Sequence, residues 1–265
     1  MRMGVIGCGG RMGRMLVAEI VATGGITLAG GCTTPGGVLV GRDVGELAGL
    51  AHHGLAVGDD AGRLIGDSDV TIDFTQPTAT ARHATAAAAA GKPIVIGTTG
   101  LSADDEKAVQ AAARQVPIVW AANTSLGINL LLGLVGQEAG RLGPDWDIEI
   151  VEMHHKGKVD APSGTALALG RVAASARGTT LEAAAQRGRD GITGARRAGD
   201  IGFAALRGGD AVGDHHVIFA GAGERLELVH RATNRAIYAK GAVRAAQWLV
   251  GRAPGLYGMK DVLEL

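Results

Sequence analysis

The segment from Glu152 to Ala166 contains the residues of this chain best suited to holding an anion and moving a proton. It reads Glu-Met-His-His-Lys-Gly-Lys-Val-Asp-Ala-Pro-Ser-Gly-Thr-Ala, so two histidines and two lysines lie within five positions. Histidine titrates near neutral pH and suits proton transfer, and a nearby lysine stabilises developing negative charge. The predicted chemistry is therefore acid–base catalysis on an anionic substrate.

The second half of this segment is typical of the start of a helix. Ser163 is a favourable N-cap residue, and the amides after it, at Gly164 and Thr165, are expected to have no partner within the helix. Such amides, aided by the helix dipole, bind carboxylate or phosphate groups. The sequence thus predicts a proton donor next to an anion-binding helix end.

The histidines of this chain do not suggest a metal site. Adjacent residues on an extended chain, such as His154 and His155, point to opposite faces, and no cysteine or carboxylate cluster completes a ligand set. We interpret the later pair His215-His216 as structural. As a hypothesis, His230 and Arg235 line the substrate pocket.

A glycine-rich loop near the start of the chain predicts a nucleotide site. Gly7-Cys8-Gly9-Gly10-Arg11-Met12-Gly13 lies between a predicted strand, Arg2–Ile6, and a predicted helix, Arg11–Ala22. Glycines permit the tight turn and let the backbone approach a pyrophosphate at the helix N-terminus. Because the spacing is Gly-x-x-Gly-x-x-Gly rather than Gly-x-Gly-x-x-Gly, a purely structural turn is the alternative.

The second predicted strand, 26–31, leaves the choice of nicotinamide cofactor open. It is followed by Cys32-Thr33-Thr34-Pro35, with no carboxylate for a ribose 2′-hydroxyl and no arginine for a 2′-phosphate, although Arg11 and Arg42 could reach the area. Both NADPH and NADH are therefore expected to be acceptable.

Two further loops each follow a predicted strand and should lie at the carboxyl edge of the sheet, where ligands bind. They are Gly97-Thr98-Thr99-Gly100 and Ala121-Ala122-Asn123-Thr124-Ser125, for which ordinary turns are the alternative. The predicted cofactor-binding residues are Gly7, Cys8, Gly9, Gly10, Arg11, Met12, Thr33, Thr34, Gly97, Thr98, Thr99, Ala121, Ala122, Asn123 and Thr124.

The order of predicted elements defines the fold class. Strands and helices alternate up to residue 121, which predicts a parallel sheet. After a helix at 126–142 and a strand at 147–153, strand-like runs at 201–207, 212–220 and 225–231 favour an antiparallel arrangement. We predict an α/β protein in which 1–125, with 235–265 returning to it, form a Rossmann-like dinucleotide-binding domain. Residues 126–234 are expected to form an α+β domain with an open mixed or antiparallel sheet, for substrate binding and oligomerisation.

Composition narrows the class of protein further. Lys and Arg total 26, as do Asp and Glu, so no basic field suggests nucleic acid. No apolar run reaches the ~18 residues of a membrane span, and no signal segment is expected at the N-terminus. The two cysteines form no paired motif, which is typical of reduced thiols. We expect a cytoplasmic protein.

The motif Glu152-x-His154-His155-x-x-Lys158-x-Asp160-Ala161-Pro162-Ser163-Gly164-Thr165-Ala166 resembles the signature of the 4-hydroxy-tetrahydrodipicolinate reductase (dihydrodipicolinate reductase) family. The resemblance covers nearly the whole chain and includes the Gly7–Gly13 loop, Asp73-Phe74-Thr75 and the tail. It implies reduction of a cyclic dicarboxylate with loss of water, by NADH or NADPH, in lysine and diaminopimelate biosynthesis. It also implies a homotetramer that assembles through the open sheet.

The same resemblance implies residue roles. His154 would be the proton donor or acceptor and Lys158 a proton donor, while His155, Ser163, Gly164 and Thr165 would bind the substrate carboxylates. The chain also departs from the family. Lys156 and Gly157 stand where arginine and histidine are frequent, Thr124 where an aromatic residue is frequent, and Gln76 where an arginine is often found.

Two alternatives remain at the level of sequence. Another small-substrate dehydrogenase, such as an aspartate dehydrogenase, would leave the His-His-x-x-Lys and Ser-Gly-Thr block unexplained. A non-catalytic dinucleotide sensor would need neither His154 nor Lys158.

Overall fold

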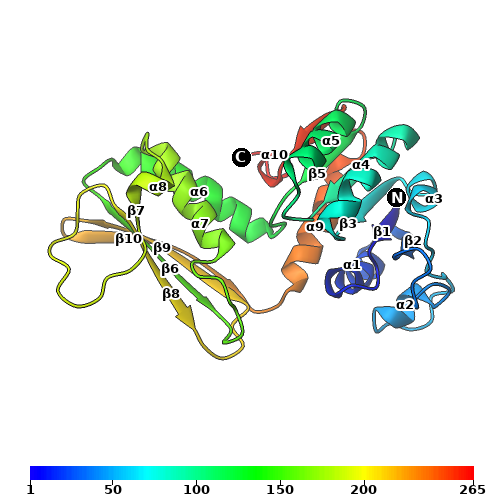
Figure 1. The fold of residues 1–265 in the computed structure, drawn as a ribbon, viewed down its shortest axis with the longest axis horizontal. Coiled ribbons are helices and arrows are strands. Elements are labelled where there is room, and N and C mark those ends of the chain that lie inside the picture. Colours follow the sequence, from blue (N-terminus) through cyan, green and yellow to red (C-terminus); the bar gives the residue numbers. More distant parts are fainter. The chain divides into compact units, whose positions relative to one another are not determined.

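The computed structural model describes all 265 residues, which form two compact units. The first unit consists of Met1–Leu126 and Ala236–Glu264, and the second of Gly127–Arg235 with Leu265. Figure 1 shows a sheet with flanking helices in each of them. None of the helices combines the length and the apolar character needed to cross a membrane.

A six-stranded parallel sheet forms the centre of the first unit (Figure 1). The strand order is β11-β5-β4-β3-β1-β2. The strands are β1 (Arg2–Ile6), β2 (Thr27–Cys32), β3 (Val70–Asp73), β4 (Ile94–Ile96), β5 (Pro117–Trp120) and β11 (Gly255–Tyr257). Because all pairings are parallel, the carboxyl ends of these strands share one edge, which is where ligands bind in such sheets. The parallel sheet predicted from the alternating elements is confirmed.

Helices cover both faces of this sheet because apolar side chains occupy both faces of its strands. Val95 packs in a core with α1 (Arg11–Ala22) and α9 (Ala236–Leu249), whereas Ile94 and Ile96 pack in a second core. The helices of that second core are α3 (Ala61–Gly66), α4 (Pro77–Ala90) and α5 (Ala103–Ala113). α2 (Val44–Leu47) and α10 (Met259–Val262) complete the unit.

The C-terminal segment belongs to the first unit. β11 pairs in parallel with β5, and α9 supplies buried residues such as Ala242 and Leu249 to the core beside α1. The tail therefore adds one edge strand to the parallel sheet.

The second unit contains a five-stranded mixed sheet in the order β10-β9-β6-β8-β7. Its strands are β6 (Asp147–His154), β7 (Ala185–Gln186), β8 (Ile201–Arg207), β9 (Gly213–Gly221) and β10 (Glu224–Ala232). β9 and β10 form the expected antiparallel hairpin. The expectation of three successive antiparallel strands was wrong for β8, which pairs in parallel with β6. α7 (Gly164–Ala176) and α8 (Leu181–Ala184) lie between β6 and β8, and a helical crossover returns the chain in the same direction.

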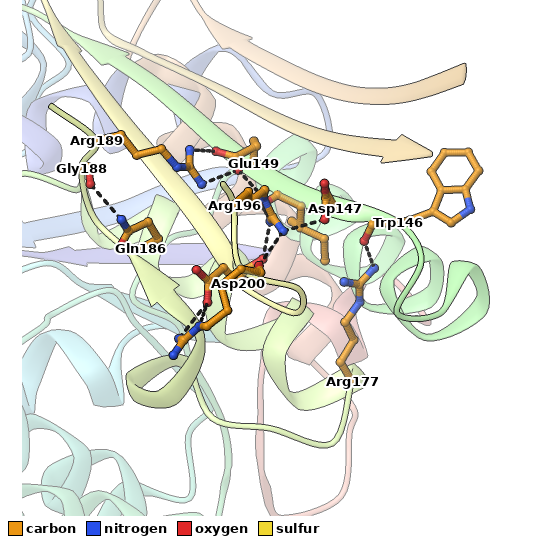
Figure 2. Close-up of polar contacts among 11 residues, drawn as sticks. Trp146, Asp147, Glu149, Arg177, Gln186, Gly188, Arg189, Arg196 and Asp200 are labelled. Carbon is orange, nitrogen blue, oxygen red and sulfur yellow. Dashed lines mark hydrogen bonds and ion pairs between the residues drawn. The ribbon is translucent and has the colours of Figure 1, made fainter. Parts of the chain in front are cut away.

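The two faces of this sheet differ in character. On the inner face, Ile148 and Ile150 of β6 pack with α7 and with α6 (Leu126–Leu142). On the outer face, the alternate residues Asp147 and Glu149 pair with arginines of the loop 187–200 (Figure 2). Glu152 and His154 follow in the inner-face alternation, so β6 delivers them to the side that carries α7.

Candidate active site

The predicted helix start after residue 162 is confirmed. Ser163 is the N-cap of α7, and its Oγ accepts a hydrogen bond from the amide of Ala166 at 3.1 Å. Gly164 and Thr165 are the first two residues of the helix. The arrangement has the form of an anion-binding helix end.

Glu152 connects this helix end to His154. Its Oε2 lies 2.6 Å from Nδ1 of His154, and its Oε1 accepts the Ser163 amide at 3.1 Å. Arg207, at the end of β8, donates to both carboxylate oxygens at 2.8 Å. Burial raises the pKa of Glu152, but the hydrogen bonds from Arg207 and His154 outweigh it and hold the pKa below its ordinary value. Glu152 is therefore an ionised carboxylate in a buried position.

His215 of β9 is the second histidine of this cluster. Its Nε2 lies 3.0 Å from the Oγ of Ser163, and its ring centroid is 5.3 Å from that of His154 in an edge-on arrangement. Burial, with a smaller effect from His154, lowers the pKa of His215 to about 4, so the ring is neutral at neutral pH. We interpreted this histidine as structural from the sequence. The register that places it opposite Glu152 is what brings it to the predicted site.

Lys158 and His155 lie on the turn after β6. The Nζ of Lys158 pairs with the carboxylate of Asp160 at 2.8 and 3.0 Å, which lowers the pKa of Asp160. The amide of His155 donates to the carbonyl of Ala211 at 2.8 Å, and its side chain is half-buried. The structure thus joins His154 and Ser163 through Glu152, whereas Lys158 is held by Asp160 within the turn.

The first unit contains a cavity of about 670 Å³ at the carboxyl edge of its sheet. The predicted cofactor residues Gly7, Gly10, Thr33 and Thr34 line it. Gly7 has a φ of 82°, a left-handed conformation that favours glycine. Gly10 caps α1 without a side-chain hydrogen bond, which leaves the first-turn amides accessible to a phosphate at that cap. These features suit a dinucleotide pyrophosphate.

Two carboxylates in this cavity were not predicted from the sequence. Asp59 and Asp60 line it because residue 58 forms a parallel bridge with Cys32, at the end of β2. The amide of Thr33 donates to the carbonyl of Gly58 at 3.0 Å, and Asp59 Oδ2 accepts the Gly36 amide at 3.3 Å. The acidic side chains absent from the end of β2 are thus supplied by a later segment, which only the tertiary pairing reveals.

A buried aspartate contacts two residues that line the cavity. Asp73 Oδ2 lies 2.9 Å from Nδ1 of His83, and its Oδ1 accepts the amide and the hydroxyl of Thr75 at 2.9 and 2.6 Å. His83 and Arg82 of α4 both line the cavity. Of these residues, only Asp73 and Thr75 were singled out from the sequence, as part of the family resemblance.

The remaining predicted cofactor residues lie along the same sheet edge but outside the lining of this cavity. Some of their side chains have internal roles. The Thr124 hydroxyl donates to the carbonyl of Tyr238 at 2.7 Å, and Thr98 is buried, with its carbonyl accepting the Trp120 indole at 3.1 Å. The Cys8 thiol is a core group whose pKa burial raises to about 11.

Comparison with known proteins identifies the family. Residues 1–124 match the model described as "Dihydrodipicolinate reductase, N-terminus", and residues 127–263 match "Dihydrodipicolinate reductase, C-terminus". A 4-hydroxy-tetrahydrodipicolinate reductase of Rhodopseudomonas palustris is 54% identical over 265 residues, which is 100% of this chain and 97% of that protein. The enzyme of the same name from Parvibaculum lavamentivorans is 56% identical over 260 residues, covering 98% of this chain and 96% of the relative.

Solved structures agree with this assignment. A dipicolinate-bound dihydrodipicolinate reductase from Paenisporosarcina sp. TG-14 superimposes with a TM-score of 0.80 at 25% identity, covering 98% of each chain. An amine dehydrogenase from Mycobacterium smegmatis matches with a TM-score of 0.60 at 14% identity, over 97% of this chain and 94% of that one. At that identity the second match indicates the fold alone.

Proposed function

Because this chain belongs to the dihydrodipicolinate reductase family, we propose that it reduces 4-hydroxy-tetrahydrodipicolinate to tetrahydrodipicolinate, with loss of water, in lysine and diaminopimelate biosynthesis. The chain is an NAD(P)-dependent oxidoreductase, and its first unit is a dinucleotide-binding Rossmann domain. The observation that carries the proposal at the level of residues is the link from His154 through Glu152 to the N-cap of α7.

The proposed chemistry separates hydride and proton. Bound NADH or NADPH supplies the hydride, and the reduced product also needs a proton, which the protein must provide. We assign proton transfer to His154, with Lys158 as a second proton donor, since both are cationic acids when protonated. The pairing of Lys158 with Asp160 keeps its ammonium near the turn that leads to α7.

The dicarboxylate needs positive charge and N–H donors. The first amides of α7, at Gly164 and Thr165, form one such site, with the helix dipole aligned to favour an anion. His155, on the preceding turn, is the proposed second contact, and Ser163 holds the helix end in place through its cap. In the first unit, the turn from Gly7 to Gly10 would hold the pyrophosphate of the cofactor.

We further propose that four copies assemble through the outer face of the second-unit sheet, in the cytoplasm. Leu206 and Val229 lie on this face with 50% and 43% of their surfaces exposed, and Val151, Met153 and Ile218 are half-buried there. An exposed apolar sheet face of this kind favours association. Light scattering after size-exclusion chromatography should give the mass of four chains, and L206K/V229K should lower it. A wild-type mass of 26.8 kDa would contradict the proposal.

The direct test is oxidation of NADH and of NADPH, in parallel, with substrate generated in situ from pyruvate and aspartate semialdehyde by the preceding synthase. Turnover that requires both the synthase and this protein is the expected result. Aspartate or other amino acids should not support cofactor reduction, which separates this activity from an amino-acid dehydrogenase. Cofactor binding without turnover would instead favour the sensor alternative.

A further inference from the structure

We propose that Glu152 and Arg207 are positioning residues, which hold His154 and the anion-binding end of α7 in a single network. This inference rests on the proposed function of His154 and α7. It adds two residues, on β6 and β8, to which the family resemblance assigned no role.

The two carboxylate oxygens of Glu152 contact different parts of the proposed site. Oε2 contacts Nδ1 of His154 at 2.6 Å, and Oε1 accepts the Ser163 amide at 3.1 Å. An ionised carboxylate only accepts hydrogen bonds, so Nδ1 carries a hydrogen and Nε2 is left to exchange a proton with a ligand. A displacement of Glu152 would therefore disturb the proton-transfer group and the helix cap together.

Arg207 compensates the negative charge of Glu152. The Glu152 side chain is 1% exposed, and a buried carboxylate requires a partner that compensates its charge. Arg207 provides this with two N–H groups, each 2.8 Å from a different oxygen, which fixes the plane of the carboxylate. The same guanidinium donates to the carbonyl of Asp160 at 2.7 Å, and so also holds the turn that carries Lys158.

The strand register explains why these residues meet. Arg207 of β8 is paired with His154 of β6, and Glu152 precedes His154 by two positions on the same face. His215, opposite Glu152 on β9, closes the other side of the cluster and contacts Ser163. Because the anchors lie on three neighbouring strands, they give the histidine a more rigid support than a loop would.

β6 also carries a matched control for a merely structural ion pair. On its outer face, Glu149 accepts two hydrogen bonds from Arg189, at 2.8 and 2.9 Å, in the same bidentate form (Figure 2). The hydrogen bonds of that pair reach neither His154 nor α7. Glu149→Gln and Arg189→Lys therefore measure what the loss of a similar pair does to the fold.

The decisive variant is Glu152→Gln. Glutamine has nearly the same shape, but its amide nitrogen cannot accept a hydrogen bond, so two of the four N–H groups that contact Glu152 lose their acceptor. We expect kcat to fall about 10- to 100-fold, within the range of a misaligned acid–base group, while the Kd for NADH changes less than twofold. Arg207→Lys keeps the positive charge but cannot form the bidentate hydrogen bonds of the guanidinium, and it should lower kcat by a smaller factor. Glu149→Gln should leave kcat within twofold, and light scattering should give the same assembled mass as for the wild type, since Glu149 lies on the proposed association face.

A spectroscopic readout distinguishes positioning from general destabilisation. Long-range ¹H–¹⁵N NMR of the histidine rings, assigned with His154→Gln, reports which ring nitrogen carries the hydrogen. In the native protein His154 should be the Nδ1–H form, and in Glu152→Gln the Nε2–H form should appear. The affinity for pyridine-2,6-dicarboxylate, measured by calorimetry, should also fall as the cap at Ser163 loosens.

The inference is overturned if Glu152→Gln keeps both native kcat and the Nδ1–H form. If that variant does not fold, as judged by circular dichroism and NADH binding, Arg207→Lys carries the same test. An absence of turnover in the wild-type protein would contradict the proposed function instead, and the NMR readout of His154 would still decide the positioning role.

Discussion

The ring of His154 packs directly against Gly213, the first residue of β9. A methyl group added at the Cα of Gly213 would lie 2.9 Å from Nε2 of His154, closer than such contacts occur. Since Nδ1 is held by Glu152 on the other side, the ring has little room to move away. Glycine at this position therefore permits the orientation of His154.

Gly213→Ala should consequently lower kcat about tenfold or more with little change in cofactor affinity, because the methyl group displaces the His154 ring. Gly208→Ala is the matched control, since its methyl group would meet only the flexible end of Met153, at 3.2 Å. Steady-state kinetics and thermal melting of both variants provide the measurement. Equal kcat in the two variants would contradict the role assigned to Gly213.

Replacement of His154 itself should have a larger effect. His154→Ala removes the proposed proton-transfer group and should lower kcat by about 10²- to 10⁴-fold, the usual range for a general acid or base. Lys158→Met should also lower kcat and, through the loss of positive charge, raise KM for the dicarboxylate. Circular dichroism should show native folds for both. Full activity of His154→Ala would show that its assigned role is wrong.

We expect a preference for NADH, because two carboxylates line the first-unit cavity that we propose as the cofactor site. Asp59 and Asp60 line the cavity next to Thr33, and their negative charge opposes a 2′-phosphate. The wild-type protein should bind NADH more tightly than NADPH, as measured by fluorescence titration of the reduced cofactors. D59N/D60N should reduce the ratio of the NADH affinity to the NADPH affinity about fivefold, which corresponds to ~1 kcal/mol of electrostatic free energy.

Asp104→Asn supplies the control for this experiment, because Asp104 is an exposed carboxylate on α5 outside the cavity lining. It should leave the ratio of the two affinities unchanged. Tighter binding of NADPH by the wild-type protein would contradict this prediction. It would indicate that the positive charge of Arg82, which lines the same cavity, acts on the 2′-phosphate more strongly than the two carboxylates.

His215 should make the stability of the second unit sensitive to moderate acid. Its pKa is lowered from 6.5 to about 4, chiefly by burial, so the unfolded chain binds a proton more readily than the folded one. Its neutral form supports the fold fully above pH 6.5, and this contribution is lost as pH falls from 6.5 towards 4. Between pH 7.5 and pH 5, the free energy of unfolding should fall by about 2 kcal/mol because of His215.

Urea unfolding across this pH range gives the free energy of unfolding of the wild type and of His215→Gln. The effect of His215 is the difference between the two slopes of this free energy against pH. Glutamine can retain a hydrogen bond to Ser163 but does not titrate. His216→Gln serves as control, since His216 follows on the opposite face of β9. Identical pH slopes in wild type and His215→Gln would rule out this role for His215.

The elements that were predicted well are those defined by local chemistry. α1 and α6 begin and end at the residues expected, and β1 and β2 were found within one residue, because buried parallel strands are short apolar runs between turns. β11 was not predicted as a strand and lies in the segment expected only as a returning tail. α2 and α8 were missed, since four residues are too few to show a helical period. The direction of β8 was also missed, because a strand's own residues do not specify which neighbour it pairs with.

By itself, the sequence determined the Ser163 cap and the glycine turn and pointed to the segment from Glu152 to Ala166 as the proposed acid–base site, since each depends on residues within a few positions of one another. Only the tertiary structure decided which distant groups complete these sites. Arg207 meets Glu152 across 55 positions and His215 meets Ser163 across 52. Asp59 lies next to the end of β2 because Gly58 forms a β-bridge with Cys32, which no local sequence pattern predicts. Such contacts depend on strand order and register. These are determined by the packing of the whole unit and not by the contacting residues alone.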